Sequence, residues 1–363
     1  MQRGGEPPVK ALVLCAGQGT RLRPLTHTRA KSLLPVAGRP VLSHILAHLK
    51  RHGLTRVGVV ISPEQTELGV LAVEVEGQQV DLIVQERPLG IAHAVQTARS
   101  WVGDEPFLLY LGDNLTNENL KPAMDLFDST GADAVVAVRE VPNPQAFGVA
   151  ELGGGRIVRV VEKPLVPPSR LVIAGIYLFR TGIFPAIDGL EPSARGEYEI
   201  TDAIAALIGS GGMVLPYAMK GWWQDMGTPD GLLTANSLML DAISTEIAPG
   251  VGLDSVRIQG RVVIGPGVVL ENVRLRGPLL IGRNSHLRDA YVGPYTSVGE
   301  GAHIRSASLE NSILLPGCRL EGPPFHLEDC LLGQGAVVEV KDGRAVTLLL
   351  GDDGRLQIPS HRR

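Results

Sequence analysis

A glycine-containing turn directly after a short apolar segment carries the first side chains that could do chemistry. Residues 9–16 form an apolar run that ends at a glycine and predicts a buried strand. Gly17 and Gly19 follow, and glycine lets backbone N–H groups approach an anion because no Cβ stands in the way. Arg21 adds a planar fork for phosphate oxygens, and Lys31 adds a point positive charge. These residues predict a phosphate site, although a Gly-x-Gly alone is equally typical of a tight turn.

The turn matches neither of the two common glycine-rich nucleotide motifs. No Gly-Lys-Ser/Thr follows it, which excludes a Walker loop. Leu22 stands where a dinucleotide fingerprint has its third glycine, and no acidic residue lies near position 37.

Two aspartates and a lysine could complete such a site. Asp113 follows the apolar segment 107–111, and a carboxylate at the carboxyl edge of a parallel sheet can hold Mg²⁺. The alternative for Asp113 is a helix cap, which contributes about 1 kcal/mol. Asp225 follows two tryptophans and could equally be a turn residue. Lys163 could bind phosphate or form an exposed ion pair with Glu162, so these residues alone leave both interpretations open.

The first two-thirds of the chain alternate between strand-like and helix-like segments. This β-α-β alternation predicts a mixed, mainly parallel sheet with helices on both faces and ligands at the carboxyl ends of its strands. Strands are expected at 9–16, 56–61, 80–84, 107–111 and 132–138, and helices at 40–52, 91–101 and 119–130. The pattern changes after about residue 139, where a hairpin around three glycines is expected. The later segments are that hairpin (147–151 and 156–162), a strand (173–179) and two helices (200–208 and 229–241).

In the last third, an aliphatic residue before glycine or proline recurs every 17 residues. The recurring residues are Ile247, Ile264, Ile281, Val298, Leu315 and Leu332. Further aliphatic residues lie six and eleven positions after most of them, so each unit offers three inward side chains. The pattern predicts a triangular solenoid with three short strands per coil. Its spacing resembles the hexapeptide repeat of left-handed parallel β-helices.

Two places interrupt or end this repeat. The pattern fails at Glu321 and His326, beside Pro323-Pro324, where one coil is expected to be distorted. Segment 344–358, broken by Asp352-Asp353-Gly354, predicts a closing hairpin. We therefore expect an α/β fold with a Rossmann-like domain at 1–243, a left-handed β-helix of 17-residue coils at 244–343, and a closing hairpin and tail at 344–363.

Composition excludes several classes of protein. The chain has 363 residues, 44% of them hydrophobic and 20% charged, so it can bury a core and is not disordered. Its net charge of −4 does not fit a nucleic-acid-binding surface. No apolar stretch approaches the roughly 18 residues of a membrane span, and the N-terminus lacks the apolar core of a secretory signal. Three cysteines are too few for a disulfide framework. We expect a cytoplasmic protein with no membrane or nucleic-acid partner.

Longer motifs resemble those of sugar-1-phosphate nucleotidyltransferases. The first is Ala16-Gly17-Gln18-Gly19-Thr20-Arg21, with Lys31-Ser32-Leu33-Leu34-Pro35 after it. The others are Gln85-Glu86-Arg87-Pro88-Leu89-Gly90, Leu111-Gly112-Asp113-Asn114, Phe147-Gly148-Val149, Val161-Glu162-Lys163-Pro164, Gly196-Glu197-Tyr198-Glu199 and Trp222-Trp223-Gln224-Asp225. The resemblance spans residues 10–240. With the appended solenoid, the chain is most similar to long-form glucose-1-phosphate thymidylyltransferases.

The resemblance implies a reaction and a cofactor. A nucleotidyl group would pass from dTTP to glucose 1-phosphate, giving dTDP-glucose and pyrophosphate, with residues 1–243 as the catalytic domain. Mg²⁺ would be bound by Asp113 and Asp225, and Arg21, Lys31 and Lys163 would be the catalytic cations. The nucleophile is a phosphate oxygen that is already ionised at pH 7, so no general base is needed. The reaction instead requires in-line positioning and neutralisation of negative charge.

Two groups of residues match the substrate positions of that family. The implied nucleotide-binding residues are Ala16, Gly17, Gly19, Thr20, Arg21, Gln85 and Gly90. The implied sugar-phosphate-binding residues are Gly148, Glu162, Lys163, Tyr177, Glu199 and Trp223. Gln85 can present both a donor and an acceptor to a pyrimidine edge. Tyr177 and Trp223 would supply apolar walls, although the sequence alone favours core positions for both.

Several alternatives stay open. UTP could replace dTTP, as in a UTP-dependent sugar-1-phosphate uridylyltransferase, because the thymine methyl group is recognised by shape. The solenoid could carry an acyltransferase activity with a histidine base, since His286, His303 and His326 lie in it. The chain could be a non-catalytic regulatory subunit, but the retained aspartates and cations argue against this. The ends and flat faces of the solenoid favour self-association, and we expect a homo-oligomer.

Overall fold

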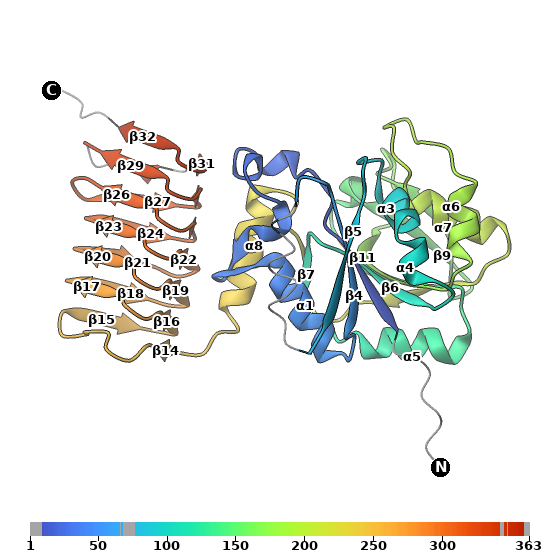
Figure 1. Cartoon of the computed structure of the whole chain (residues 1–363), viewed down its shortest axis with the longest axis horizontal. Helices are drawn as coiled ribbons and strands as arrows, with labels where there is room; N and C mark the ends of the chain where they lie inside the picture. The colour runs from blue at the N-terminus through green and yellow to red at the C-terminus, as the bar shows by residue number, and fades with distance from the viewer. Residues whose placement is uncertain (1–8, 66, 68–76, 342–344, 347, 359–363) are drawn as a thin grey trace, which may run out of the picture. The chain divides into compact units, whose positions relative to one another are not determined.

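The computed structural model describes residues 9–65, 67, 77–341, 345–346 and 348–358 (Figure 1). They form two compact units. The first unit contains described residues of Met1–Gln18 and Leu42–Trp223, and the second contains Gly19–Val41 with described residues of Gln224–Arg363. The chain therefore leaves the first unit inside the glycine turn and returns to it at Leu42.

The first unit is built on a mixed nine-stranded sheet. Seven strands follow the order β10-β9-β11-β6-β1-β4-β5, and β8 pairs with both β11 and β12. Neighbours among β1, β4, β5 and β6 pair in parallel, whereas β9, β10 and β11 pair antiparallel. The strands are β1 (Lys10–Leu14), β4 (Arg56–Ile61), β5 (Gln79–Val84), β6 (Phe107–Leu111), β8 (Ala134–Glu140), β9 (Gly148–Gly153), β10 (Arg156–Glu162), β11 (Leu171–Phe179) and β12 (Val214–Ala218). The predicted α/β fold and the predicted hairpin, β9–β10, are confirmed.

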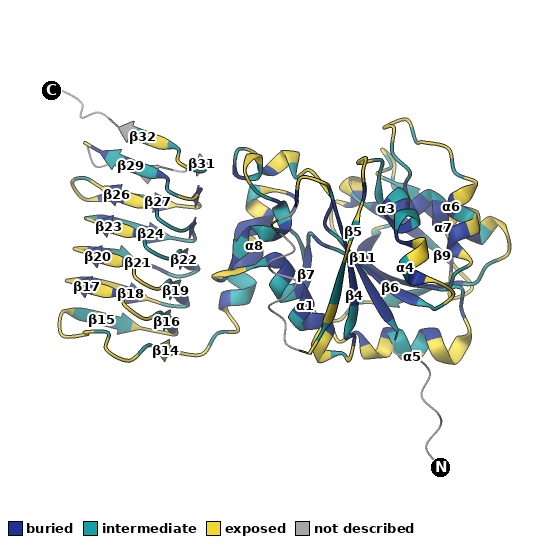
Figure 2. Cartoon of the chain, in the orientation of Figure 1, coloured by how far each residue is buried: buried dark blue, intermediate teal, exposed yellow. Residues whose placement is uncertain are grey.

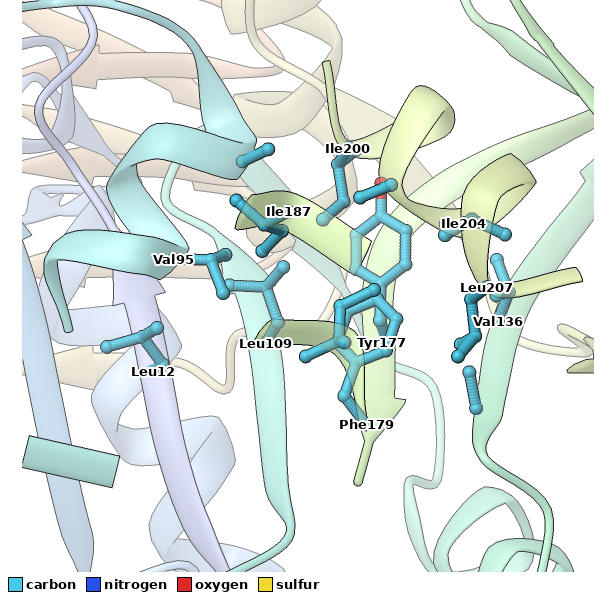
Figure 3. Close-up of a cluster of buried hydrophobic side chains, with 14 of the residues drawn as sticks. Leu12, Val95, Leu109, Val136, Tyr177, Phe179, Ile187, Ile200, Ile204 and Leu207 are labelled. Carbon is cyan, nitrogen blue, oxygen red and sulfur yellow. The ribbon is translucent and has the colours of Figure 1, made fainter. Parts of the chain in front are cut away.

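Helices of this unit cover an apolar core. Leu109 of β6 and Tyr177 and Phe179 of β11 belong to one buried cluster with Ile187 and Ile204 (Figure 3). The helices are α1 (Val41–Arg51), α3 (Ile91–Thr97), α4 (Arg99–Val102), α5 (Lys121–Thr130), α6 (Ile183–Asp188) and α7 (Ile200–Gly209). No helix within the described part of the chain is long and apolar enough to cross a membrane.

The second unit contains a parallel β-helix made of three sheets. The first sheet is β14 (Glu246–Ile247), β16 (Val262–Ile264), β19 (Leu279–Ile281), β22 (Thr296–Val298), β25 (Ile313–Leu314), β28 (Leu331–Leu332) and β31 (Leu349–Leu350). The second is β15 (Val256–Gln259), β18 (Val273–Arg276), β21 (Tyr291–Val292), β24 (Ala307–Glu310), β27 (Phe325–Glu328) and β30 (Ala345–Val346). The third is β17 (Val269–Glu271), β20 (His286–Arg288), β23 (His303–Arg305), β26 (Arg319–Glu321), β29 (Val337–Val340) and β32 (Arg355–Ile358). Buried and exposed residues alternate along many of these strands (Figure 2), and the buried ones are mostly aliphatic residues of one cluster. The predicted left-handed β-helix is confirmed.

The register of the coils corrects one detail of the sequence prediction. Val298 pairs with Leu314, not with Leu315, so this coil advances by 16 residues instead of 17. The inward residues of the next strands are Leu320 and Leu327, each directly beside an expected position, Glu321 or His326. The coil is therefore distorted near Pro323-Pro324, as predicted, but the aliphatic core continues because the chain slips by one residue.

The predicted closing hairpin is wrong. β30, β31 and β32 each pair in parallel with a strand of the preceding coil, namely β27, β28 and β29. The turn at Asp352-Asp353-Gly354 fits a hairpin equally well by sequence, but the last coil offers three unpaired strand edges. Parallel pairing therefore satisfies more backbone groups than an isolated hairpin would.

Residues 19–41 pack against the β-helix and against α8 (Pro229–Leu240), all within the second unit. They form the 3₁₀ turns η1 (Thr20–Leu22), η2 (Leu25–His27) and η3 (Lys31–Leu33) and the short strands β2 (Pro35–Val36) and β3 (Arg39–Pro40). Asn236 of α8 is fully buried and accepts hydrogen bonds from Ala37 N (2.9 Å) and Ser297 Oγ (2.7 Å). It also donates to Tyr295 O at 2.8 Å, so one side chain joins the loop, the helix and a coil.

Candidate active site

In the first unit, the ends of β1 and β6 lie against each other at the carboxyl edge of the sheet. Gly112 N donates to Leu14 O at 2.9 Å, and a Cβ at Gly112 would lie only 2.6 Å from that oxygen. This close approach places Asp113 beside the segment that leads into the glycine turn. Ala16 is buried there and Gly17 is exposed.

Asp113 is oriented by a short chain of hydrogen bonds. Asn114 Nδ2 donates to Asp113 Oδ1 at 2.8 Å, and Trp223 Nε1 donates to Asn114 Oδ1 at 2.7 Å. Trp223 starts β13 (Trp223–Asp225) and packs edge-on against Phe147. The half-buried indole of Trp223 therefore acts as a hydrogen-bond donor as well as an apolar wall.

Four of the predicted sugar-phosphate residues cluster in the first unit. Glu162, at the end of β10, accepts a hydrogen bond from Thr201 Oγ1 at 3.1 Å and lies 3.5 Å from Lys163 Nζ. A Cβ at Gly148 would lie 2.7 Å from Thr201 Cγ2, so a glycine is required for this approach. Glu199 is buried and accepts from Ser193 Oγ at 2.9 Å.

Arg195 joins the two carboxylates of this cluster and was not predicted. Its Nη2 lies 2.7 Å from Glu199 Oε1 and 3.2 Å from Glu162 Oε1. The only sequence signal is its position directly before the Gly196-Glu197-Tyr198-Glu199 motif. A surface arginine in a loop is usually solvated. The fold reveals that this one contacts both Glu162, 33 positions earlier, and Glu199, 4 positions later.

Tyr177 belongs to the core and not to an exposed wall. Its ring stacks on Phe179 at 5.5 Å and its side chain is buried in the cluster between sheet and helices (Figure 3). Burial, together with the negative charges of Glu162 and Asp113, raises the pKa of its hydroxyl above the ordinary value, so it stays protonated.

Gln85 and Gly90, predicted to contact the base, lie together. Gln85 is buried, and its Nε2 is 2.8 Å from His93 Nδ1 and 3.3 Å from Gly90 O. Burial, and then the nearby charge of Arg87, lowers the pKa of His93, so a neutral ring accepts this hydrogen bond. Gly90 has a φ of 101°, and a Cβ there would lie 2.6 Å from Tyr198 O. Packing alone therefore requires this glycine.

In the second unit, three predicted residues gather around two glycines. Gly19 has a φ of 60°, and a Cβ there would lie 3.2 Å from Lys31 Cβ. A Cβ at Gly227 would lie 2.5 Å from Arg21 Nη2 and 2.9 Å from Asp225 Oδ1. Thr20 starts η1 directly after Gly19 and is exposed. The second unit thus brings the guanidinium of Arg21 and the carboxylate of Asp225 to the same glycine.

In the nucleotidyl transfer that the sequence motifs predict, Gly227→Ala is expected to reduce kcat/KM by about 100-fold, because the new methyl group would displace the Arg21 guanidinium by about 1 Å. Steady-state kinetics with purified full-length chain measures the effect. The matched control is Gly182→Ala, where φ is −58° and nothing lies within 4 Å of the new Cβ. Equal activity of the two variants would show that the position of Arg21 does not matter.

Each of the two predicted metal ligands is a carboxylate held by a hydrogen bond, Asp113 within the first unit and Asp225 within the second. Among the residues that the structure describes, no three His, Cys, Asp or Glu side chains form a metal-binding group. Gly227 N donates to Asp225 Oδ1 at 2.6 Å, and Asn114 holds Asp113 in the same way. Mg²⁺ usually takes one or two carboxylates together with phosphate oxygens and water. The carboxylate of each residue is therefore a suitable donor for this ion.

Comparison with known proteins places the chain in a family. A family model described as nucleotidyl transferase matches residues 10–242. The chain is 37% identical over 359 residues to a glucose-1-phosphate thymidylyltransferase of Streptomyces griseus, covering 97% of this chain and 100% of that protein. It is 40% identical over 258 residues to a low-salt glycan biosynthesis nucleotidyltransferase, Agl11, of Haloferax volcanii, covering 70% and 72%. It is also 38% identical over 226 residues to the UTP–glucose-1-phosphate uridylyltransferase AglF of that organism, covering 61% and 93%.

A solved structure supports the same assignment. A Bacillus anthracis protein assigned as a glucose-1-phosphate thymidylyltransferase superposes with a TM-score of 0.60 at 33% identity, covering 66% of this chain and 98% of that one. The share of this chain that superposes, 66%, is about as long as the segment 10–242 that the family model matches. The Streptomyces griseus protein matches 97% of the chain, which includes the β-helix. The chain is therefore an enzyme of the nucleotidyl transferase family and belongs to its sugar-1-phosphate nucleotidyltransferases.

Proposed function

We propose that this enzyme transfers a nucleotidyl group from dTTP to glucose 1-phosphate and releases dTDP-glucose and pyrophosphate. The observation that carries the proposal is that Arg21 and Asp225 lie together at Gly227 and that Lys31 lies beside Gly19. It occurs in a chain that matches a thymidylyltransferase over its full length. Two cations beside a glycine turn suit the triphosphate, which is the most highly charged of the reactants.

Charge neutralisation and positioning account for the reaction. Attack of the sugar phosphate oxygen on the α-phosphorus brings two anions together, and Arg21 and Lys31 reduce their repulsion. We propose that Asp113 and Asp225 hold Mg²⁺, which would supply Lewis-acid stabilisation of the phosphate charge when bound. Asn114 and Gly227 N keep one oxygen of each carboxylate in place through hydrogen bonds.

The remaining predicted residues divide between the two substrates in this proposal. Ala16, Gly17, Gly19 and Thr20 offer backbone to the triphosphate, and Gln85 with Gly90 contacts the base. Glu162, Glu199 and Gly148 bind sugar hydroxyls, with Trp223 beside them. Arg195 keeps the carboxylates of Glu162 and Glu199 in place, and Tyr177 belongs to the core cluster of the same unit.

Lys163→Ala is expected to raise the KM for glucose 1-phosphate by about tenfold with a smaller change in kcat, because a charge-assisted contact is lost in the ground state too. Lys163 has a φ of 39°, an unusual conformation that aims its half-exposed side chain beside Glu162. Initial-rate kinetics at varied sugar phosphate measures the split. Lys121→Ala, which removes an exposed lysine paired with Asp125, is the control. An unchanged KM would place the sugar phosphate elsewhere.

The proposal is tested with a panel of nucleoside triphosphates and sugar 1-phosphates, with pyrophosphate release as readout. The highest kcat/KM is expected for dTTP with glucose 1-phosphate. A higher value for UTP would identify a uridylyltransferase, and turnover of acetyl-CoA with an amino sugar would reveal an acyltransferase. No pyrophosphate release with any pair would contradict the proposal. We also propose catalysis by residues 1–243 and self-association through the β-helix, for which light scattering is the measurement.

A further inference from the structure

A groove on the outer face of the second β-helix sheet is unrelated to the candidate active site. It has a volume of about 600 Å³, within the usual range of small-molecule sites. Its polar lining residues are Arg257, Gln259, Arg274, Arg276, Tyr291 and Ser308, and we call it the arginine groove. They come from β15, β18, β21 and β24, four successive strands of one sheet.

The strand register stacks like charges along this groove. Arg257 pairs with Arg274, which pairs with Tyr291, and Tyr291 pairs with Ser308. Arg276 lies on the same face two residues after Arg274. Neither Arg257 nor Arg274 forms an ion pair with a carboxylate of any residue that the structure describes. Like charges on paired positions destabilise a sheet unless something neutralises them.

One of the three arginines already has a partner. Arg276 hydrogen-bonds to the Tyr291 hydroxyl, which donates to Glu310 Oε1 at 2.8 Å. Arg257 and Arg274 form the neighbouring column, two residues earlier on β15 and β18, so excess positive charge is concentrated where these two arginines are paired. An anion long enough to contact arginines on two adjacent strands would neutralise this charge.

We propose that the arginine groove binds a nucleoside diphosphate or one of its esters. Strands in a sheet lie about 4.8 Å apart, so two arginines in register can each bind one of two linked phosphoryl groups through charge-assisted hydrogen bonds. The ring of Tyr291 follows next in the same column and can pack against a base or sugar ring. A single phosphate would use only one arginine, and an apolar ligand would leave both charges uncompensated.

Hydrogen–deuterium exchange of the full chain with and without dTDP tests the proposal. dTDP is expected to slow amide exchange in peptides covering residues 256–276 as well as in peptides covering the glycine turn. In the double variant Arg257→Gln/Arg274→Gln, the dTDP concentration that gives half-maximal protection of 256–276 is expected to rise about tenfold or more. Protection of the glycine turn is expected to stay unchanged. The control, Arg288→Gln/Arg305→Gln on the third sheet, is expected to behave as the wild type.

Three results would overturn the proposal, and they are distinguishable. Protection of the glycine turn without protection of 256–276 would refute the groove and leave the proposed function standing. Protection of neither would refute both. Slowed exchange of 256–276 that follows protein concentration and not dTDP would identify a contact between two copies of the chain.

A second inference comes from contacts between the cation-bearing loop and the final coil. Arg29 lies between η2 and η3, two residues before Lys31. Its Nη2 donates to Asp352 Oδ2 at 2.8 Å and to Gln334 Oε1 at 2.7 Å. Thr28 Oγ1 also donates to Asp352, whose other oxygen accepts from Gln334 N at 2.7 Å. The Asp352 side chain is only 7% exposed, so this is a desolvated ion pair with all its oxygens used.

We infer that Asp352 is a positioning residue for Lys31, an inference that rests on the proposed function. The carboxylate fixes residues 28 and 29, and the chain has only one residue, Ala30, between them and Lys31. The β-helix thereby sets the place of a cation that the triphosphate needs. Burial opposes ionisation of Asp352, but the hydrogen bonds from Thr28, Gln334 and Arg29 outweigh it and lower the pKa of the carboxyl group.

Kinetics of Arg29→Ala, Asp352→Ala and the double variant test this inference. Each is expected to raise the KM for the nucleoside triphosphate about tenfold with the KM for sugar 1-phosphate unchanged, and the double variant should lose no more than either single one. Glu321→Gln, at an exposed position of another coil, is the control. Additive losses, or equal changes in both KM values, would show a general structural role and overturn the inference. If the wild type is active and the variants have unchanged KM values, the inference about Asp352 is refuted and the proposed function still stands.

Discussion

Asp113→Asn and Asp225→Asn are each expected to abolish nucleotidyl transfer while the fold stays intact. Asparagine keeps the size and hydrogen-bonding shape of aspartate, so Asn114 and Gly227 N keep a partner at each position. What each variant loses is a negative charge, and a neutral amide oxygen is a much weaker ligand for Mg²⁺. The proposed metal links the two phosphate-bearing reactants, so either loss removes charge stabilisation from the transition state.

Pyrophosphate release over a Mg²⁺ titration, with thermal unfolding in parallel, measures this effect. A drop of about 1,000-fold or more in kcat/KM at an unchanged melting temperature is expected. Asp104→Asn, an exposed aspartate after α4, is the matched control and should retain full activity. Full activity of either active-site variant would eliminate a metal site with two carboxylates. Recovery at high Mg²⁺ in only one variant would identify the other aspartate as the stronger ligand.

Asn236→Ala is expected to lower the free energy of unfolding by about 3 kcal/mol or more. The side chain is fully buried, and its removal leaves Ala37 N, Ser297 Oγ and Tyr295 O without this partner. An unsatisfied buried polar group costs about 1–3 kcal/mol, and three are created at once. Because Asn236 joins loop, helix and coil, the loss should also loosen residues 19–41.

Urea denaturation followed by circular dichroism measures the change. Thr234→Ala, on the same helix, is the control because its hydroxyl bonds only to Asp230 O within the helix. A change within about 0.5 kcal/mol is expected there. If both variants lost equal stability, the polar network around Asn236 would contribute nothing beyond helix propensity.

The parts of the fold that repeat locally could be predicted from sequence, and those that depend on a single long-range contact could not. The hairpin β9–β10 follows from local glycines and alternating residues, and the 17-residue period follows from inward aliphatic side chains. The slip to Leu314 could not be predicted, because Ile313, Leu314 and Leu315 satisfy the same pattern and only the neighbouring coil selects one. The last three strands were misassigned for the same reason: their partners lie in the preceding coil.

At the candidate site, sequence motifs identify the residues that could do chemistry. The residues that hold them in place are recognised only from how the folded chain packs. The polar side chains at Asp113 and Glu162 were predicted, but Asn114 and Arg195, which orient them, were not assigned roles. Nothing in the order of residues 19–41 indicates that they pack against coils more than 200 residues later in the chain, as Gly38 does beside Leu280 and Arg29 does on Asp352. Such contacts depend on the shape of two folded surfaces, which composition and periodicity do not encode.

The packing of residues 19–41 bears on how this enzyme can be dissected. The family model ends at residue 242, which invites a recombinant fragment that stops at the start of the β-helix. Such a fragment would retain Gly19, Arg21 and Lys31 but lose Leu280, against which Gly38 packs, and the carboxylate that holds Arg29. It would lack part of the surface against which its own loop packs. The end of the family match at residue 242 therefore does not coincide with a boundary of the folded units, because residues 19–41 belong to the unit that contains the β-helix.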